Sequence, residues 1–546
     1  MACLSTSQKR LRGRGKDAGR ISMAERTPTS VLVAVLLWVV IIGGIAATVR
    51  YLVLPRYQDQ KRDALALQTS SQGKYKLEVR VALDSFSGYC ILRSAGMAES
   101  LARQGIRLSL TDDGADYMQR IKALQKGDVD MAVFPVNSFI QCGAQLGEFP
   151  AAIVYLVDET KGADAIVALK SAVPAISALN AADARIVLTP NSPSEFLARV
   201  MIASFSLPEL PPRKWSIEKD GVEAVYKMFR ADSGEKRLAY AMWEPYVSKA
   251  LKDGHAQVLL DSSKVRGYIV DVLVARREFL IDHDDAARSV LETYARSAYA
   301  HQARMVDVVM ADAQLAGDKI DRTEAVQMVK GIEWKNTLEN YAHFGLQGEA
   351  HSLENIEDII IKITGVLIKT GALESDPLNG QPNRLYFNKL LQDMKAADFH
   401  PGRALNVISG MDMGANDETV RVEAKLAALT EAQWESLVSV GALSVEPVTF
   451  GRGTSRISIQ SEHELASLAN TLNSWPQYYL SVTGRVRPGG EAQDALNLAK
   501  ARAEAVVQML QAKGVAPERL RALAVIGASD SAEDQSVSFV VGQLPY

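Results

Sequence analysis

Cysteine is scarce in this chain, with three residues in 546, and the spacings that metal chemistry needs are missing with it. Cys90 and Cys142 lack a C-x-x-C partner, and the seven histidines never take H-x-x-x-H spacing. The sequence also lacks a G-x-S-x-G elbow, a P-loop and a dinucleotide-binding glycine fingerprint. These absences predict a protein that binds rather than catalyses, with no catalytic residue, metal or cofactor.

A surplus of charge is also missing. The formal net charge is −3, which leaves no basic excess to neutralise phosphates and excludes nucleic acid as the main partner. A hydrophobic content of 47% with 23% charged residues is ordinary for globular proteins, and the length allows several domains.

One long stretch contains no charge at all: SVLVAVLLWVVIIGGIAATV, residues 30–49. At about 1.5 Å rise per residue it spans a bilayer core of about 30 Å, and it exceeds the roughly 7–15 apolar residues of a signal-peptide core. Lysines and arginines crowd the preceding tail, residues 1–29, and should stay in the cytoplasm. The sequence predicts a single-pass inner-membrane protein, with a helix at 30–50, a linker at 51–74 and the bulk in the periplasm. The alternative is a cleaved signal ending near Ala46-Ala47.

The predicted membrane topology places the cysteines in different compartments. Cys3 would be cytoplasmic, whereas Cys90 and Cys142 would share an oxidising compartment, where they could form a disulfide.

Strands and helices alternate from residue 75 onwards. KLEVRVALD (76–84), IRLSLTDD (106–113) and VDMAVFPV (129–136) read as strands, and ADYMQRIKALQKG reads as a helix that ends at Gly127. Strand–helix–strand units of this length predict parallel pairing with right-handed crossovers, hence an open α/β sheet.

The segment ARIVLTPNSPSEFLARVMIASF (184–205) repeats the pattern and contains a capping box. Ser192 is the N-cap, Pro193 the first helical residue, and Glu195 follows three residues after the cap. Such a terminus could hold an anion, or could be only a well-capped helix.

A Trp-Glu-Pro interrupts the apolar run LAYAMWEPYV (238–247). Proline stops a strand, so Trp243 and Glu244 lie where a strand gives way to a loop, the usual place for ligands in α/β folds. The alternative is that Trp243 plugs the core and Glu244 caps the next helix.

The rest of the chain divides in two. A long helical stretch covers about 284–398, and a loop-rich linker region covers 399–444. A separate α/β domain of about 100 residues, a usual domain size, follows at 445–546.

The order of segments over 75–398 resembles the nitrate/sulfonate/taurine-type periplasmic solute-binding proteins of ABC transporters. The motifs that carry the resemblance are DSFSGY (84–89), ALQKGDVDMAVFPVNSF (123–139), LTPNSPSEFL (188–197), AMWEPYV (241–247) and VLVARREFL (272–280). IEWKNTLENY (332–341) also looks like the family's C-terminal helical part. The resemblance implies the type II binding-protein fold: two α/β lobes, the second at about 166–262, that close on a ligand by hinge motion.

The resemblance also implies the ligand site and its partners. It places on the cleft Ser87, Gly88, Tyr89, Asn137, Ser138, Ser192, Ser194, Trp243 and Glu244. It implies a small anionic or organic solute, and an ABC permease or a sensing partner. The cysteine-rich motif of the related thiamine-pyrimidine synthases is absent.

Residues 445–546 resemble the OmpA-like peptidoglycan-binding domain. Gly484 and Arg502-Ala503 take the family's spacing, but Arg487 stands where the family has an aspartate. Arg502 could bind the carboxylate of diaminopimelate, whereas Arg487 would repel its ammonium. We therefore expect weak or no peptidoglycan binding and contact with another envelope component through Arg487 and Arg502.

Two functions follow from these readings. The first is a tethered receptor that binds a solute for ABC-type transport or sensing. The second is an envelope scaffold or sensor that links the inner membrane to the cell wall or to a protein partner.

Overall fold

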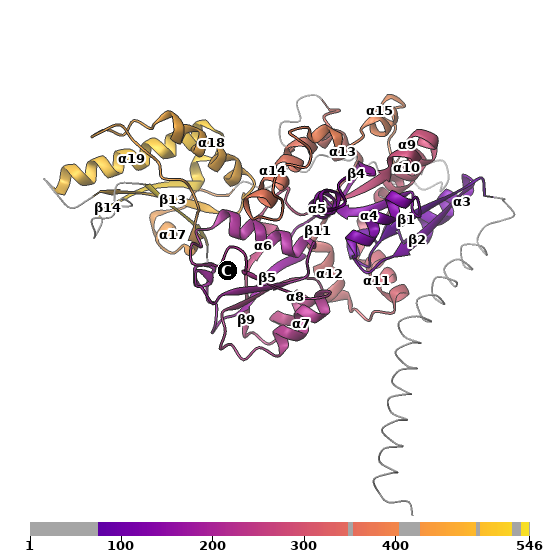
Figure 1. The fold of residues 1–546 in the computed structure, drawn as a ribbon, viewed down its shortest axis with the longest axis horizontal. Helices are drawn as coiled ribbons and strands as arrows, with labels where there is room; N and C mark the ends of the chain where they lie inside the picture. Colours follow the sequence, from indigo (N-terminus) through magenta and orange to yellow (C-terminus); the bar gives the residue numbers. More distant parts are fainter. Residues whose placement is uncertain (1–74, 348–352, 403–425, 487–491, 527–536, 545–546) are drawn as a thin grey trace, which may run out of the picture. The chain divides into compact units, whose positions relative to one another are not determined.

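A computed structural model describes residues 75–347, 353–402, 426–486, 492–526 and 537–544. The predicted membrane segment at 30–49 and Arg487 lie outside these residues. Among the helices described, none has the length and apolar character needed to cross a membrane. Three sheets organise the described part of the chain (Figure 1).

Six strands form the sheet of the first lobe, in the order β11-β4-β10-β3-β1-β2. They are β1 (Leu77–Leu83), β2 (Ile106–Asp112), β3 (Met131–Pro135), β4 (Ala151–Thr160), β10 (Val270–Arg276) and β11 (Ile332–Trp334). β1 pairs in parallel with β2 and β3, whereas β10 runs antiparallel to β3 and β4. The sheet is therefore mixed rather than parallel, because β10 returns from the second lobe in the opposite direction.

Four short helices lie between these strands, and two of them begin at side-chain caps. They are η2 (Ser87–Tyr89), α3 (Ala95–Arg103), α4 (Tyr117–Lys126) and α5 (Val136–Leu146). Ser94 caps α3 and Asp116 caps α4, each by accepting a backbone N–H three residues on. α4 ends at Gly127, whose φ of 75° is the left-handed conformation that favours glycine, as the sequence predicts.

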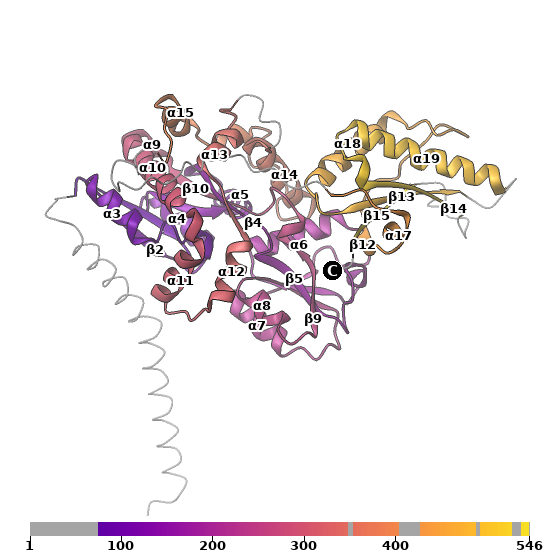
Figure 2. The ribbon, with the colours of Figure 1, turned by 180° about the vertical axis from the view of Figure 1, so that it is seen from behind.

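Five strands form the second sheet, in the order β7-β6-β8-β5-β9. Its strands are β5 (Asp164–Leu169), β6 (Arg185–Leu188), β7 (Ser216–Glu218), β8 (Leu238–Trp243) and β9 (Ala256–Asp261). Its helices are η3 (Ile176–Leu179), α6 (Pro193–Ser204), α7 (Val222–Arg230) and α8 (Tyr246–Leu251). α7 and α8 lie side by side in both ribbon views (Figures 1 and 2).

This second sheet is buried on both faces. In β5, Ile166 and Ala168 belong to one apolar cluster, and Ala165 and Val167 to another. Successive side chains of a strand point to opposite faces, so a strand covered on both sides needs the continuous apolar run that the sequence shows.

Two connections join the lobes. β4 leads into β5 through residues 161–163, and β9 leads back into β10 through 262–269, which include η4 (Ser262–Lys264). β4 and β10 pair antiparallel in the first sheet, with Asp271 directly opposite Asp158. The crossover strands therefore bring together residues that are distant in the sequence. This double-crossover, two-lobed α/β arrangement is the one implied by the resemblance.

Helices dominate the segment after β10. They are α9 (Arg277–Asp282), α10 (Asp284–His301), η5 (Gln302–Arg304), α11 (Met305–Ala316), α12 (Arg322–Lys330), α13 (Thr337–His343), α14 (Ile356–Lys369), η6 (Pro382–Arg384) and α15 (Lys389–Ala396). The prediction of a continuous helical stretch was wrong at Ile332–Trp334, which forms β11. This short strand pairs with β4, because the sheet edge offers it backbone partners that outweigh local preference.

Four strands form the C-terminal sheet, in the order β12-β15-β13-β14. Its elements are α17 (Glu431–Glu435), β12 (Val438–Ala442), α18 (Ile459–Asn473), β13 (Tyr479–Val486), α19 (Ala492–Ala512), η7 (Pro517–Arg519), β14 (Leu520–Ile526) and β15 (Val537–Gln543). α19 packs on β13 and β14, with α18 beside it (Figures 1 and 2). β12 pairs with β15, so this sheet starts upstream of the boundary predicted at 445.

The C-terminal domain packs directly against the second lobe. The rings of Phe205 and Trp475 lie 5.4 Å apart, edge to face. The backbone N–H of Ser206 donates to Ala442 O at 2.9 Å. The backbone N–H of Arg266, in the return crossover, donates to Ser474 O at 2.7 Å.

The disulfide that the sequence allows between Cys90 and Cys142 is not formed: both are free, buried thiols. Cys90 lines a groove with Arg93 and Asp312, whereas Cys142 lies inside α5. The two sulfurs therefore face different surroundings. Burial raises the pKa of each thiol to about 12.

Candidate functional site

The predicted first-lobe residues Ser87, Gly88 and Tyr89 form η2, directly after β1. Asp84 shapes this turn, because its Oδ1 accepts the backbone N–H of Phe86 at 2.9 Å. Gly88 lies so close to β4 that a Cβ at this position would be 2.4 Å from Asp158 Oδ2. No larger side chain fits here without a shift, so Gly88 brings η2 against the crossover strand.

Asn137 and Ser138 lie in the first turn of α5 and contact the second lobe. Ser138 Oγ donates to Asn191 O at 2.6 Å, and Asn137 Nδ2 donates to Ser192 O at 3.4 Å. Both side chains are fully buried, and no hydrogen-bond partner among the described residues reaches Asn137 Oδ1. The structure thus brings these first-lobe residues to the start of α6, where Ser192 lies.

The start of α6 is satisfied by its own side chains. Ser192 Oγ accepts the backbone N–H of Glu195 at 3.0 Å, and the Glu195 carboxylate accepts the backbone N–H of Asn191. Glu195 is in turn paired with Arg199 at 2.6 Å. The start of α6 is therefore well capped, as the sequence predicts. Ser194 points elsewhere: its Oγ donates to Asp164 Oδ1 at 2.6 Å.

Trp243 ends β8 directly opposite Asp164 of β5. Its ring is half-buried at the edge of the second apolar cluster, so it is neither a full core plug nor an exposed residue. Glu244 accepts the Ser248 hydroxyl at 2.8 Å and the Ser248 backbone N–H at 3.2 Å, which caps the start of α8. The capping alternative therefore describes Glu244.

Sequence reasoning missed the residues that give this region its charge. Four buried aspartates adjoin the predicted residues, with exposures of 5% or less: Asp84, Asp158, Asp164 and Asp271. The available signal was a carboxylate inside an apolar strand, as in AAIVYLVDET and YIVDVLVAR. A charge is buried there only when something compensates for the loss of water.

Asp158 and Asp271 form a carboxyl pair across β4 and β10. No hydrogen-bond donor from another described residue reaches either oxygen of Asp158 or Oδ1 of Asp271. Burial raises the pKa of Asp158 to about 8 and that of Asp271 well above its ordinary value. Asp158 raises the pKa of Asp271 further, whereas the hydrogen bond between the two acids lowers that of Asp158. The pair therefore retains a proton at neutral pH.

The other two aspartates have partners. Arg120, with a fully buried side chain, donates to Asp84 at 2.9 Å, to Asp113 at 2.5 Å and to Val133 O at 2.5 Å. Burial raises the pKa of Asp164 to about 6, although Ser194 donates a hydrogen bond to it.

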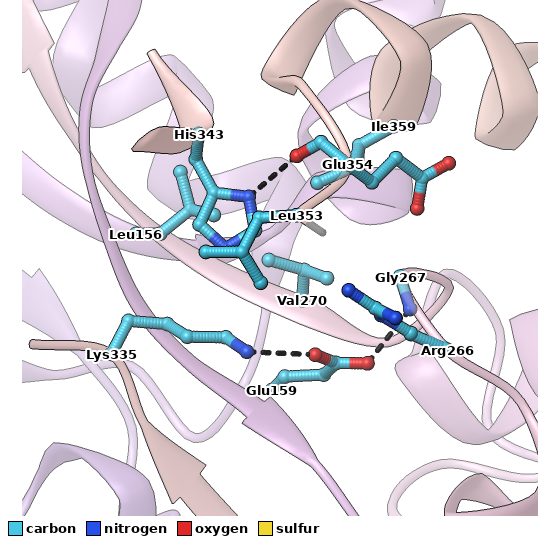
Figure 3. A pocket seen from close by; sticks show the side chains of 10 residues that line it. All are labelled: Leu156, Glu159, Arg266, Gly267, Val270, Lys335, His343, Leu353, Glu354 and Ile359. Carbon is cyan, nitrogen blue, oxygen red and sulfur yellow. Dashed lines mark hydrogen bonds and ion pairs between the residues drawn. The ribbon is translucent and has the colours of Figure 1, made fainter. Parts of the chain in front are cut away.

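Glu159, next to Asp158 along β4, faces a different small cavity (Figure 3). Lys335 Nζ lies 2.9 Å from its carboxylate, and the backbone N–H of Gly267 donates to it at 2.7 Å. The cavity volume of about 10 Å³ suits one water molecule. Burial lowers the pKa of His343 to about 4, and its Nδ1 lies 2.6 Å from Glu354 O. This site belongs to the hinge and has no room for an organic solute.

The C-terminal domain places Arg502 and Gly484 as follows. Arg502 Nε donates to Thr454 O at 3.1 Å, and its guanidinium lies 4.9 Å from the centre of the Phe450 ring. A Cβ at position 484 would lie 2.1 Å from Ala499 O, so glycine lets α19 approach β13. Gly484 is therefore a packing residue.

Comparisons place these domains among known proteins. Residues 449–538 match the OmpA family, and no curated relative matches the sequence. The ligand-binding component of an ABC-type import system from Staphylococcus aureus is 16% identical, with a TM-score of 0.43; the match covers 58% of this chain and 99% of that chain. The periplasmic aliphatic sulphonate binding protein SsuA from Escherichia coli is 15% identical, with a TM-score of 0.42, over 57% of this chain and 92% of that chain.

An enzyme is also similar. The desulfurization enzyme DSZB is 10% identical, with a TM-score of 0.39, over 59% of this chain and 100% of that chain.

Proposed function

We propose that this chain, whose residues 449–538 form an OmpA-family domain, is a membrane-anchored periplasmic solute-binding protein that serves ABC-type transport or sensing. The anchor is supported by the charge-free run at 30–49 and its basic flank. Binding rather than catalysis is supported by the absence of catalytic motifs from the sequence.

One observation supports solute binding above the others. Two crossover strands join the lobes, and the hydrogen bond from Ser138 Oγ to Asn191 O closes the first lobe on the second at the predicted cleft. A contact of this kind can form and break as two lobes hinge, which is how a two-lobed protein captures a solute.

We expect Trp243→Ala to abolish the response to a solute while the protein stays folded. The whole chain, purified in detergent, is screened by thermal shift against small anions, sulfonates, pyrimidines and amines. A solute at 100 times its dissociation constant should stabilise the natural protein by about 2.7 kcal/mol. Trp243→Ala should lose this shift, because the ring lies beside Asp164 at the end of β8.

Tyr226→Ala is the matched control. Tyr226 is another half-buried ring at the edge of the same apolar cluster, and it packs against Tyr246. It should lower the melting temperature to a similar degree and leave the solute shift intact. A full shift in Trp243→Ala would remove this residue from the site, and no shift with any solute would contradict the proposed function.

The scaffold function is the second candidate. It is favoured by the direct packing of the C-terminal domain on the second lobe and on the return crossover. A protein that linked membrane and wall could use such a direct contact whether or not its cleft held a solute.

We expect little binding of the natural chain to peptidoglycan, and a gain of at least about tenfold in Arg487→Asp. The substitution removes the cation that would repel the diaminopimelate ammonium and supplies its counter-ion. Co-sedimentation with purified sacculi measures the effect. Arg485→Asp, the same charge change two residues away on β13, should give no gain. Strong sedimentation of the natural chain that Arg487→Asp leaves unchanged would contradict the charge argument.

A further inference from the structure

Acidic side chains surround the predicted cleft. On the first lobe and its crossovers they are Asp84, Asp158 and Asp271; on the second lobe they are Asp164 and Glu244. Two of them adjoin predicted ligand residues: Gly88 abuts Asp158, Ser194 donates to Asp164, and Asp164 pairs in register with Trp243. The predicted cleft therefore carries negative charge from both lobes.

The buried cations nearby are already neutralised. Arg120 lies between Asp84 and Asp113, at 2.9 and 2.5 Å. Lys335 lies between Glu159 and Glu333, at 2.9 and 2.7 Å. Each of these cations faces two carboxylates, so neither supplies a counter-ion of its own to the Asp158–Asp271 pair.

An anion would find the expected helix terminus occupied. The start of α6 already receives the Glu195 carboxylate, which accepts the Asn191 N–H and pairs with Arg199. A sulfonate or nitrate at this position would have to displace that carboxylate and approach Asp164, to which Ser194 is bound. Like-charge repulsion in a buried site costs several kcal/mol, so the arrangement disfavours anions.

The Asp158–Asp271 pair instead offers acceptors. The residues lie directly opposite each other, with exposures of 0% and 2%. Apart from the proton that the two acids share, no donor from the described residues reaches three of their four carboxylate oxygens. Asn137 Oδ1, fully buried on the first turn of α5, is a further acceptor without a donor in the described part of the chain. Pro135, two residues before Asn137, pairs in register with Asp271. Buried acceptors of this kind are normally satisfied, and N–H donors are what would satisfy them.

The geometry favours an organic cation over a metal ion. In the residues that the structure describes, no group of three or more His, Cys, Asp or Glu side chains gathers as metal ligands do. Aromatic rings accompany the acids, since Tyr89 follows Gly88 in η2 and Phe86 packs edge to face on it at 5.3 Å. Rings beside carboxylates suit an ammonium or amidinium group.

We propose that the cleft binds an organic ammonium or amidinium cation whose N–H groups donate to Asp158 and Asp271. This inference rests on the proposed solute-binding function and assigns its substrate class. It narrows the small anionic or organic solute of the sequence-based expectation to an organic cation.

The test uses the whole chain in detergent and isothermal titration calorimetry with two kinds of probe. 1,4-Diaminobutane and agmatine represent the cations, and methanesulfonate and nitrate represent the anions. We expect the cations to bind and the anions not to bind. Asp158→Asn and Asp271→Asn should each weaken cation binding at least about tenfold, because a charge-assisted hydrogen bond is lost. Asp253→Asn, which removes an exposed carboxylate paired with Arg230, should leave binding unchanged.

The outcomes separate this inference from the function beneath it. Anion binding without cation binding would overturn the inference and leave the solute-binding function standing. Cation binding that neither Asp158→Asn nor Asp271→Asn weakens would overturn the assignment of these acids. Silence with both probe classes would overturn the inference, and with the wider screen it would also overturn the solute-binding function.

Discussion

Asp158→Asn is expected to stabilise the protein by about 5 kcal/mol at pH 8 and by about 1–2 kcal/mol at pH 5. Burial raises the pKa of Asp158 from an ordinary value of 3.8 to about 8; the charges of Asp164 and Glu159 add to the rise, and the hydrogen bond with Asp271 and the charge of Lys335 oppose it. An acid whose pKa is higher in the folded than in the unfolded protein contributes stability that is fully present below pH 3.8. This stability is lost as the pH rises through 8. Asparagine is uncharged in both the folded and the unfolded protein, so Asp158→Asn does not lose this stability as the pH rises.

Urea unfolding of the whole chain at pH 5 and pH 8 measures this effect. The natural protein should lose several kcal/mol between these pH values relative to Asp158→Asn. Asp253→Asn, whose carboxylate is 59% exposed, serves as the control and should keep the natural pH dependence. Equal pH slopes for the natural protein and Asp158→Asn would show that the carboxyl pair is not coupled to folding.

Arg120→Met should cost about 3–5 kcal/mol of stability at pH 7. The substitution keeps the long apolar stem but leaves Asp84 and Asp113 buried without the guanidinium that lies 2.9 and 2.5 Å away. It also leaves Val133 O without a donor. Thermal and urea unfolding would both report the loss.

Arg237→Met provides the comparison for Arg120→Met. Arg237 pairs with Asp183 at 2.7 Å, but both side chains are about half exposed, and such surface pairs contribute about 0–1 kcal/mol. A large loss for Arg237→Met, or a small one for Arg120→Met, would contradict the view that burial sets the difference.

Much of the fold could be predicted from local pattern. The alternation of apolar residues located β1, β2 and β3, and the helix signals located Gly127 and Ser192 as boundaries. These features depend on residues close together in the sequence, so their physics is visible there. β11 was missed because three residues carry too little pattern, and its stability comes from pairing with β4.

The candidate site was only half predictable. The motifs located Gly88, Ser138 and Trp243, but not the charge around them. Asp158 and Asp271 are far apart in the sequence, and only the antiparallel register of β4 and β10 places them opposite each other. An isolated aspartate in an apolar strand signals a buried charge, whereas its partner follows from tertiary structure alone.

Glu195 shows a second limit of structure prediction from neighbouring residues in the sequence. The sequence could not distinguish a helix start that receives an anion from one already filled, because both use Ser192 as the cap. The structure places the Glu195 carboxylate on the Asn191 N–H and pairs it with Arg199. The side chain that decides between the alternatives lies in the same motif, but its conformation is set by its neighbours.

The packing of Phe205 against Trp475 affects how the two domains of this chain can evolve. A domain that is joined to its neighbour only by a linker can be exchanged or deleted with little loss of stability. Here the exchange would uncover the Phe205 ring, which is 2% exposed, and would remove the acceptor of the Arg266 N–H. Phe205 and Trp475 each form part of the other's surroundings, so a change of size at one position favours a compensating change at the other. The sequences of the two domains are therefore expected to change together during evolution.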